Sequence, residues 1–170
     1  MNRDIRDTVI VGGGVSGMSA GIFSARLGLN TVLLERLMPG GQVINAEKVE
    51  DYPGFPNGVS GAELVGLMQD QAMSAGTEIS LTEVTEIKPR DSGIDVITYD
   101  SAIRTHTVII AGGSTLTKLS VPGEDKLEGS GVSYCATCDG AFFLDQKVCV
   151  IGGGDSAFEE ALTLTGFASS

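Results

Sequence analysis

The chain has 170 residues, of which 42% are hydrophobic and 19% are charged, so it can bury a sizeable core and is not intrinsically disordered. Its formal net charge is −11 and it holds 11 Lys and Arg, which disfavours nucleic acid and anionic membrane surfaces as partners. No apolar stretch is long enough to cross a membrane, and residues 1–7 lack the apolar core of a signal peptide. We therefore expect a globular, cytoplasmic protein.

Residues 8–35 show the pattern of a strand, a helix and a second strand. Residues 8–11 form a short apolar run typical of a buried parallel strand. Residues 15–28 predict a helix whose small residues would let it approach a sheet closely, and residues 31–35 predict a second buried strand. This is a βαβ unit with short connections.

A glycine-rich signature, Gly12-x-Gly14-x-x-Gly17, lies between the first strand and the helix. In such a turn the first glycine permits a tight bend, the second lets a pyrophosphate approach the backbone, and the third allows close helix–strand packing. The helix N-terminus favours phosphates, and Glu35 stands where a carboxylate can accept hydrogen bonds from ribose hydroxyls. The combination predicts a dinucleotide site, whereas a glycine-rich turn alone would account neither for Glu35 nor for the small-residue helix.

Turn signals and one helix follow the second strand. Residues 36–60 contain several Pro and Gly pairs and predict an ordered excursion with turns rather than a regular element. Ser60, with Glu63 three positions later, predicts a capping box at the start of a helix that runs to about Ala75.

Three strand-like runs come next, at residues 82–87, 93–99 and 104–111. The middle run alternates between apolar and polar residues, as an antiparallel strand with one solvated face would. The polar segment 114–130 then predicts a linker between two domains.

Residues 147–151 predict another buried strand, which leads into a second signature, Gly152-x-Gly154-x-x-Ala157, and a helix over 155–166. The residue that would read the ribose in such a domain would lie beyond residue 170, so the sequence does not separate NADH from NADPH. Because one strand and one helix cannot make a sheet, we expect an incomplete second nucleotide-binding domain and an N-terminal fragment of a longer protein.

Cys135-x-x-Cys138 predicts a redox-active pair that can close a small disulfide. Two alternatives are a zinc site, for which only Cys149 and His106 remain as further ligands, and two unpaired surface thiols. Cys149 lies in the predicted strand 147–151, and we expect it to be a buried, inert thiol. Asp139 follows the pair directly and could protonate a leaving thiolate, or it could cap a helix.

Several segments together resemble low-molecular-weight thioredoxin reductases, which are class II pyridine nucleotide-disulfide oxidoreductases. They are the two glycine-rich signatures, Gly40-Gly41-Gln42, Tyr52-Pro53-Gly54-Phe55 and, most specifically, Cys135-Ala136-Thr137-Cys138-Asp139-Gly140. The resemblance implies a three-layer α/β, Rossmann-like FAD/NAD(P)-binding fold. Residues 1–113 would be the first part of a split FAD-binding domain, 114–130 a linker, and 131–170 the start of an NADPH-binding domain.

The resemblance also implies site residues and partners. NADPH would reduce FAD, the flavin would reduce the disulfide through Cys138, Cys135 would attack thioredoxin, and Asp139 would donate the proton. A homodimer and no metal are implied for the intact protein. The FAD residues would be Gly12, Gly14, Gly17, Glu35, Gly40, Gly41, Gln42, Asp51, Val84, Ala111 and Gly112, and the NADPH residues would be Gly152, Gly154, Asp155, Ser156 and Ala157.

The chain departs from the usual pattern of these reductases at three places. Ala111-Gly112-Gly113 stands where Ala-Thr-Gly is usual, Asp51 replaces an Asn expected near the flavin, and Val15-Ser16 replaces a commoner Pro-Ala pair. The largest expected departure is truncation, since the rest of the NADPH-binding domain and the returning C-terminal segment of these reductases are absent from the sequence. Two alternatives to a thioredoxin reductase remain. One is a catalytically inert partial flavoprotein fold, and the other is a related flavoprotein with another acceptor, such as a dithiol oxidase or a peroxiredoxin reductase.

Overall fold

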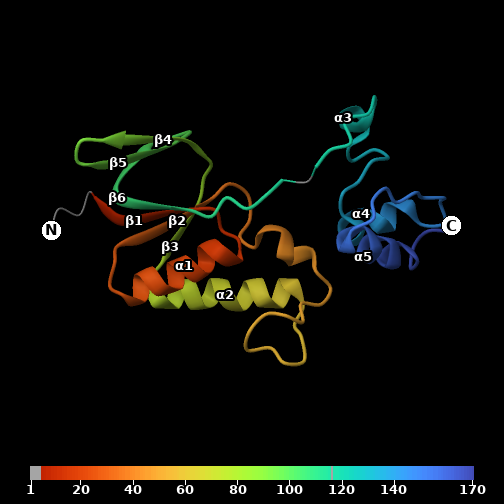
Figure 1. The fold of residues 1–170 in the computed structure, drawn as a ribbon, viewed down its shortest axis with the longest axis horizontal. Helices are drawn as coiled ribbons and strands as arrows, with labels where there is room; N and C mark the ends of the chain where they lie inside the picture. Colours follow the sequence, from red (N-terminus) through yellow and green to blue (C-terminus); the bar gives the residue numbers. More distant parts are fainter. Residues whose placement is uncertain (1–4, 116) are drawn as a thin grey trace. The chain divides into compact units, whose positions relative to one another are not determined.

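The structure is a computed structural model that describes residues 5–115 and 117–170. The chain divides into two compact units, the first ending at Ser114 and the second beginning at Thr115 (Figure 1). Each unit is described by itself.

A six-stranded mixed sheet forms the centre of the first unit, with the strand order β3-β2-β1-β6-β5-β4. The first four strands in this order run parallel, and β6, β5 and β4 form an antiparallel meander. The strands are β1 (Arg6–Val11), β2 (Thr31–Glu35), β3 (Glu78–Leu81), β4 (Val84–Arg90), β5 (Gly93–Thr98) and β6 (Ala102–Ile110).

Two helices, α1 (Val15–Arg26) and α2 (Gly61–Ala75), pack against each other and cover one face of the parallel strands (Figure 1). The predicted cap of α2 is confirmed, because Ser60 Oγ accepts a hydrogen bond from the Glu63 backbone N–H at 3.2 Å. A short 3₁₀ helix, η1 (Gly41–Asn45), lies between β2 and α2. None of the helices among the described residues is long and apolar enough to cross a membrane.

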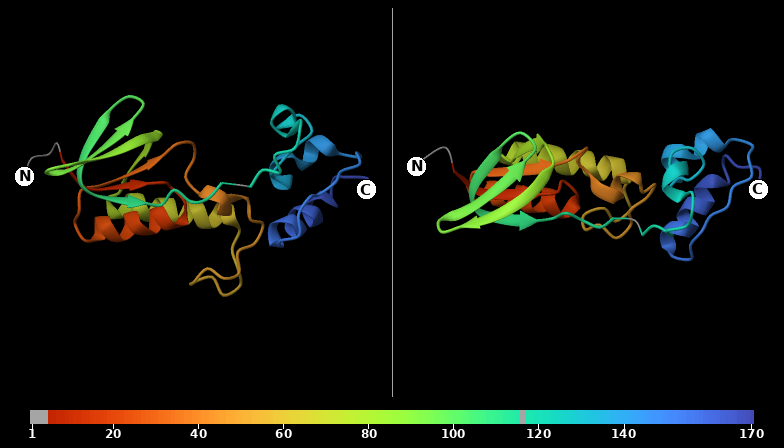
Figure 2. Two further views of the ribbon diagram at one scale, coloured as in Figure 1. Left: turned by 45° about the horizontal axis from the view of Figure 1, so that its top comes forward. Right: turned by 90° about the horizontal axis from the view of Figure 1, so that it is seen from above.

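Each parallel strand buries side chains on both of its faces. Ile10 of β1 and Leu33 of β2 pack with Met18 and Leu64 of the helices. Their neighbours Val9, Val32 and Leu34 point the other way and pack with Val96 of β5, so the hairpin of β4 and β5 lies over the face opposite the helices (Figure 2). The helices, the parallel strands and the hairpin form three layers, and the predicted α/β Rossmann-like fold is confirmed.

Most of the predicted elements of this unit are present with small changes at their ends. The exception is β3, which the sequence did not indicate. It has only four residues, none of them fully buried, and its apolar signal is therefore weak. The predicted alternation in β5 is confirmed, since Val96 and Thr98 are buried and Ile97 between them is only half-buried.

The second unit contains short helices: α3 (Glu124–Leu127), α4 (Ala136–Asp139), η2 (Gly140–Phe143) and α5 (Asp155–Leu164). The polar segment expected as a linker holds α3. The strand predicted over 147–151 is wrong, since this segment is irregular. No strand follows β6 among residues 111–115 and 117–170, so the segment has no parallel partner to bond with.

Replacing the fully buried Leu33 by alanine tests the core beneath the helices. We expect the Leu33→Ala variant to lose about 3 kcal/mol of unfolding free energy, because the cavity lies between a sheet and two packed helices. The matched control is Leu37→Ala, whose side chain is 73% exposed and whose loss should cost less than about 0.5 kcal/mol. Urea denaturation followed by far-UV circular dichroism gives both values, and equal losses would contradict this description of the core.

Candidate functional site

The glycine-rich turn after β1 is built from backbone contacts that exclude side chains. Gly12 has φ +105°, and a Cβ there would overlap the carbonyl oxygen of Ala111 at the end of β6. A Cβ on Gly17 would overlap the carbonyl oxygen of Gly12, so α1 packs directly on the turn. The turn, the first turn of α1 and the end of β6 therefore meet at one point.

Glu35, the last residue of β2, holds its carboxylate beside this turn. Its Oε2 accepts a hydrogen bond from the Gly13 backbone N–H at 2.7 Å, and its Oε1 accepts one from the Leu37 N–H at 3.1 Å. The acid that the sequence singled out is thus brought to the glycine-rich turn by the pairing of β1 with β2.

A second glycine loop packs against the first. Gly40 donates its N–H to the Gly13 carbonyl oxygen at 2.8 Å and forms an isolated parallel bridge with Gly14. Gly41 has φ +61°, and a Cβ there would lie 3.3 Å from the Gly14 Cα. The two loops therefore meet through backbone atoms, with no side chain between them.

Gln42 ties this loop to the segment after β6, because its Nε2 donates to the carbonyl oxygen of Ser114 at 2.8 Å. Most of the predicted FAD residues are thereby gathered at one edge of the sheet. Asp51 is exposed in the loop before Tyr52, and Val84 packs against the core on the hairpin side. The gathered residues are Gly12, Gly14, Gly17, Glu35, Gly40, Gly41, Gln42, Ala111 and Gly112.

This arrangement fits a dinucleotide pyrophosphate. Gly14 is the N-cap of α1 without a side-chain cap, and the first turn of α1 has no acidic residue. The positive end of the helix dipole is therefore available to phosphates, and the missing Cβ atoms leave room for a close approach.

In the second unit, Cys135 and Cys138 are joined in a disulfide with their Cα atoms 5.3 Å apart. Cys135 is the N-cap of α4, and its Sγ accepts a hydrogen bond from the Cys138 N–H at 3.1 Å. Cys135 is half-buried, whereas Cys138 is exposed. The pair is thus a short loop at a helix start, which is a geometry suited to thiol–disulfide exchange.

Asp139 ends α4 and is held by Ser133, a residue that the sequence did not single out. The Ser133 hydroxyl donates to Asp139 Oδ2 at 2.7 Å and accepts the Cys135 backbone N–H at 3.1 Å. Asp139 stands at the N-cap position of η2, but its side chain makes no capping hydrogen bond there, and the N-cap of α4 is Cys135.

A polar cluster precedes the cysteines. The buried Glu124 accepts hydrogen bonds from the Tyr134 hydroxyl at 2.7 Å and from the Leu119 and Ser120 backbone N–H groups. The hydrogen bond from Tyr134 is the main cause that lowers the pKa of Glu124, and the same bond raises the pKa of Tyr134. Tyr134 adjoins Cys135, so the cluster fixes the chain just before the disulfide.

The second glycine-rich turn leads into α5. Gly152 has φ +153°, a Cβ there would lie 2.8 Å from the Ala157 Cβ, and Gly154 is the N-cap of α5 without a side-chain cap. Asp155 and Ser156 open the helix and are exposed. The expectation that Cys149 is buried is wrong: it is an exposed free cysteine, because the irregular segment 147–151 enters no sheet.

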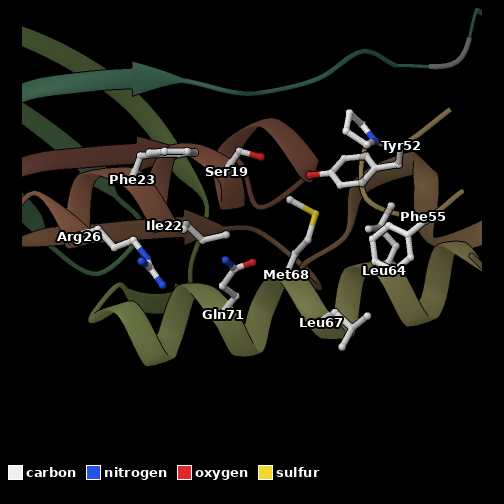
Figure 3. A pocket seen from close by; sticks show the side chains of 11 residues that line it. Ser19, Ile22, Phe23, Arg26, Tyr52, Phe55, Leu64, Leu67, Met68 and Gln71 are labelled. Carbon is white, nitrogen blue, oxygen red and sulfur yellow. The ribbon is translucent and has the colours of Figure 1, made fainter.

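A separate groove of about 410 Å³, lined by both apolar and polar side chains, lies along α1 and α2 (Figure 3). Phe23 and Arg26 of α1, Leu67 and Gln71 of α2, and Tyr52 of the intervening loop are among its lining residues. None of the site residues predicted from the sequence lines it, so the groove is distinct from the glycine-rich turn.

The first unit has the α/β fold and the glycine-rich turn that are typical of nucleotide-binding domains, and the second unit adds a disulfide in a Cys-x-x-Cys loop. Comparison with known proteins identifies the family. Residues 6–170 match the family described as pyridine nucleotide-disulphide oxidoreductase, and the chain belongs to it.

Its relatives are named thioredoxin reductases. The Bacillus subtilis (strain 168) thioredoxin reductase is 44% identical over 165 residues, which is 97% of this chain and 52% of that protein. A crystal structure of Lactococcus lactis thioredoxin reductase in its FR conformation has a TM-score of 0.92 and 45% identity, covering 97% of this chain and 54% of that one. A crystal structure of T. acidophilum thioredoxin reductase has a TM-score of 0.90 and 37% identity, covering 99% of this chain and 55% of that one. The chain spans about half the length of these relatives.

The Glu35→Gln variant tests how the carboxylate supports the glycine-rich turn. A glutamine keeps one acceptor oxygen but directs an NH₂ group at the second backbone N–H, so we expect a loss of about 1 kcal/mol in unfolding free energy. Glu47→Gln, at an exposed position in the next loop, is the matched control and should be neutral. Denaturation curves of the two variants decide this, and an unchanged Glu35→Gln midpoint would contradict the role of the carboxylate.

Proposed function

We propose that the protein is an FAD-dependent thioredoxin-disulfide reductase, which passes electrons from NADPH through a flavin and the Cys135–Cys138 disulfide to thioredoxin. The observation that carries the proposal is that disulfide, set in a Cys-Ala-Thr-Cys-Asp segment of a chain that also holds a dinucleotide-type turn. The names of the relatives support the same activity, and the proposal concerns the whole protein.

In this proposal residues 1–113 belong to an FAD-binding domain. The backbone at Gly12, Gly14 and Gly17 would receive the pyrophosphate, and Glu35 would turn its carboxylate to the ribose hydroxyls. Gly40, Gly41 and Gln42 would lie along the pyrophosphate and flavin side, and Asp51 would lie near the flavin. Val84, Ala111 and Gly112 would complete the pocket. The bound flavin would supply two-electron transfer between the nicotinamide and the disulfide.

Residues 131–170 would begin an NADPH-binding domain, joined by the segment 114–130. Gly152, Gly154 and Ala157 would form the phosphate turn, with Asp155 and Ser156 at the start of α5. The bare N-cap at Gly154 supports this assignment.

The thiol chemistry would use three residues of the second unit. Two electrons and two protons open the disulfide to Cys135 and Cys138 thiols. The Cys135 thiolate would then attack the thioredoxin disulfide, and Asp139, held by Ser133, would protonate the departing thioredoxin thiolate. Cys138, the sulfur that faces the flavin in this scheme, would finally attack Cys135 in the mixed disulfide, which closes the pair again and releases the second thioredoxin thiol.

The Cys138→Ser variant tests the proposal in the whole protein. Without the second sulfur the pair cannot close, and NADPH-dependent reduction of thioredoxin should fall by at least about a thousandfold. Cys149→Ser is the matched control, since Cys149 is exposed and unpaired, and it should retain turnover within about twofold. Turnover that survives Cys138→Ser would reject the mechanism.

Two alternatives are separated by simple measurements. Exposed Val150 and Ile151 favour an inert partial fold for residues 1–170 alone, which flavin absorbance in the purified chain would contradict. A dithiol oxidase would consume oxygen with dithiol and without nicotinamide, and a peroxiredoxin reductase would reduce a peroxiredoxin in place of thioredoxin.

A homodimer and a cytoplasmic location belong to the same proposal. The free, exposed Cys149 suits a reducing compartment. Large apolar side chains stay exposed on α1 and α2, namely Phe23, Leu67 and Met73, and Leu27 directly after α1 is exposed as well. A two-fold axis would bring this patch against its own copy.

The Phe23→Asp variant tests the dimer. Phe23 is 70% exposed, and a carboxylate in its place would be buried against the second copy, so dimer affinity should fall at least about tenfold. Tyr99→Asp is the matched control, as Tyr99 is 76% exposed and lies outside the groove. Sedimentation velocity at several concentrations measures the effect, and an unchanged equilibrium in Phe23→Asp would exclude this surface.

A further inference from the structure

The dithiol helix α4 is docked on α5, the helix that follows the second glycine-rich turn (Figure 1). Ala136, the first residue of α4, is 6% exposed. At the other end of α4, a Cβ on Gly140 would lie 2.8 Å from the ring of Phe167, just after α5. The disulfide segment therefore rests on a neighbouring element at both of its ends.

One side chain of α5 completes this docking with a hydrogen bond. The Glu160 carboxylate accepts the backbone N–H of Ala136, directly after Cys135. The N–H groups of a first helical turn have no partner within the helix, so a side-chain acceptor satisfies one of them and fixes the helix start. Neither the glycine-rich signatures nor the cysteine motif includes Glu160.

The docking has a consequence for the two sulfurs. Cys135 precedes the anchored Ala136 and is half-buried, whereas Cys138 lies one turn further on and is exposed. Both cysteines belong to the same short helix and its cap, and that helix contacts α5.

We propose that Glu160 is a positioning residue for the redox dithiol: it anchors α4 on α5 and so keeps Cys135 less accessible than Cys138. The catalytic meaning of this order rests on the proposed function, in which Cys135 is the sulfur that attacks thioredoxin. Glu160 would then shield that sulfur from small electrophiles and oxidants, while a docked partner protein still reaches it.

The experiment measures how alkylation divides between the two sulfurs. The full chain is reduced, treated briefly with limiting iodoacetamide and digested, and mass spectrometry gives the ratio of modified Cys138 to modified Cys135. We expect Cys138 to dominate in the native chain. In Glu160→Ala the ratio should fall by roughly fivefold, the population change that matches the loss of one hydrogen bond.

Two further variants separate anchoring from general destabilisation. Glu160→Gln keeps an acceptor oxygen and should retain the native ratio. Glu159→Ala removes the adjacent, exposed carboxylate of the same helix and should leave the ratio unchanged. If Glu160→Ala does not fold, Glu160→Met, which keeps the length of the side chain but lacks the acceptor oxygen, takes its place: a fallen ratio supports the proposal and a native ratio overturns it.

A native ratio in a folded Glu160→Ala also overturns the proposal, as does an equal fall in Glu160→Gln and Glu160→Ala. The alkylation ratio needs neither thioredoxin nor NADPH. If the native protein lacks reductase activity, the proposed function is rejected, while the alkylation ratio still tests the role of Glu160. If the native protein turns over normally but the alkylation ratio is unchanged in Glu160→Ala, only the proposed role of Glu160 is rejected.

Discussion

The close approach of backbone to backbone at Gly12 and Gly17 is the contact on which the first unit depends. A side chain at Gly17 would overlap the Gly12 carbonyl oxygen, and one at Gly12 would overlap that of Ala111. Because both positions lack a Cβ, α1 starts immediately after β1 and the end of β6 lies against the same turn. Gly40 then bonds to this turn through the Gly13 carbonyl oxygen. The geometry that suits a pyrophosphate is thus the same geometry that holds three elements together.

The two units are stabilised in different ways. The first buries apolar side chains on both faces of its parallel strands, such as Ile10 and Val9 on β1. The second has short helices, and specific polar contacts hold its cysteine segment. Glu124 accepts from the Tyr134 hydroxyl, and Glu160 accepts from the Ala136 backbone. A single hydrogen bond contributes on the order of 1 kcal/mol, and only a few such bonds hold the dithiol segment. Losing one of them should therefore change the position of this segment more than the stability of the whole chain.

Hydrophobic periodicity and capping signals were sufficient to predict β1, α1, β2 and α2, since each carries its own local pattern. They failed over 147–151, where an apolar run lacks a partner strand among the described residues and leaves Cys149 exposed. The glycines and cysteines of the candidate site were recognisable because their chemistry depends on spacing. The contact from Gln42 to Ser114 joins residues 72 apart, and that from Glu160 to Ala136 joins residues 24 apart. Such contacts follow from tertiary packing, which a local pattern does not encode.

The pairing of β1 with β6 imposes an order on folding. The Thr8 and Thr107 hydroxyls lie 3.0 Å apart across this pair, although 99 residues separate them in the chain. Until β6 has been synthesised, one side of β1 has no strand to pair with, whereas the hairpin of β4 and β5 pairs residues that are close in sequence. The glycine-rich turn reaches its final form only when Ala111 arrives beside Gly12. The turn therefore depends on a residue that is synthesised after nearly the whole of the first unit.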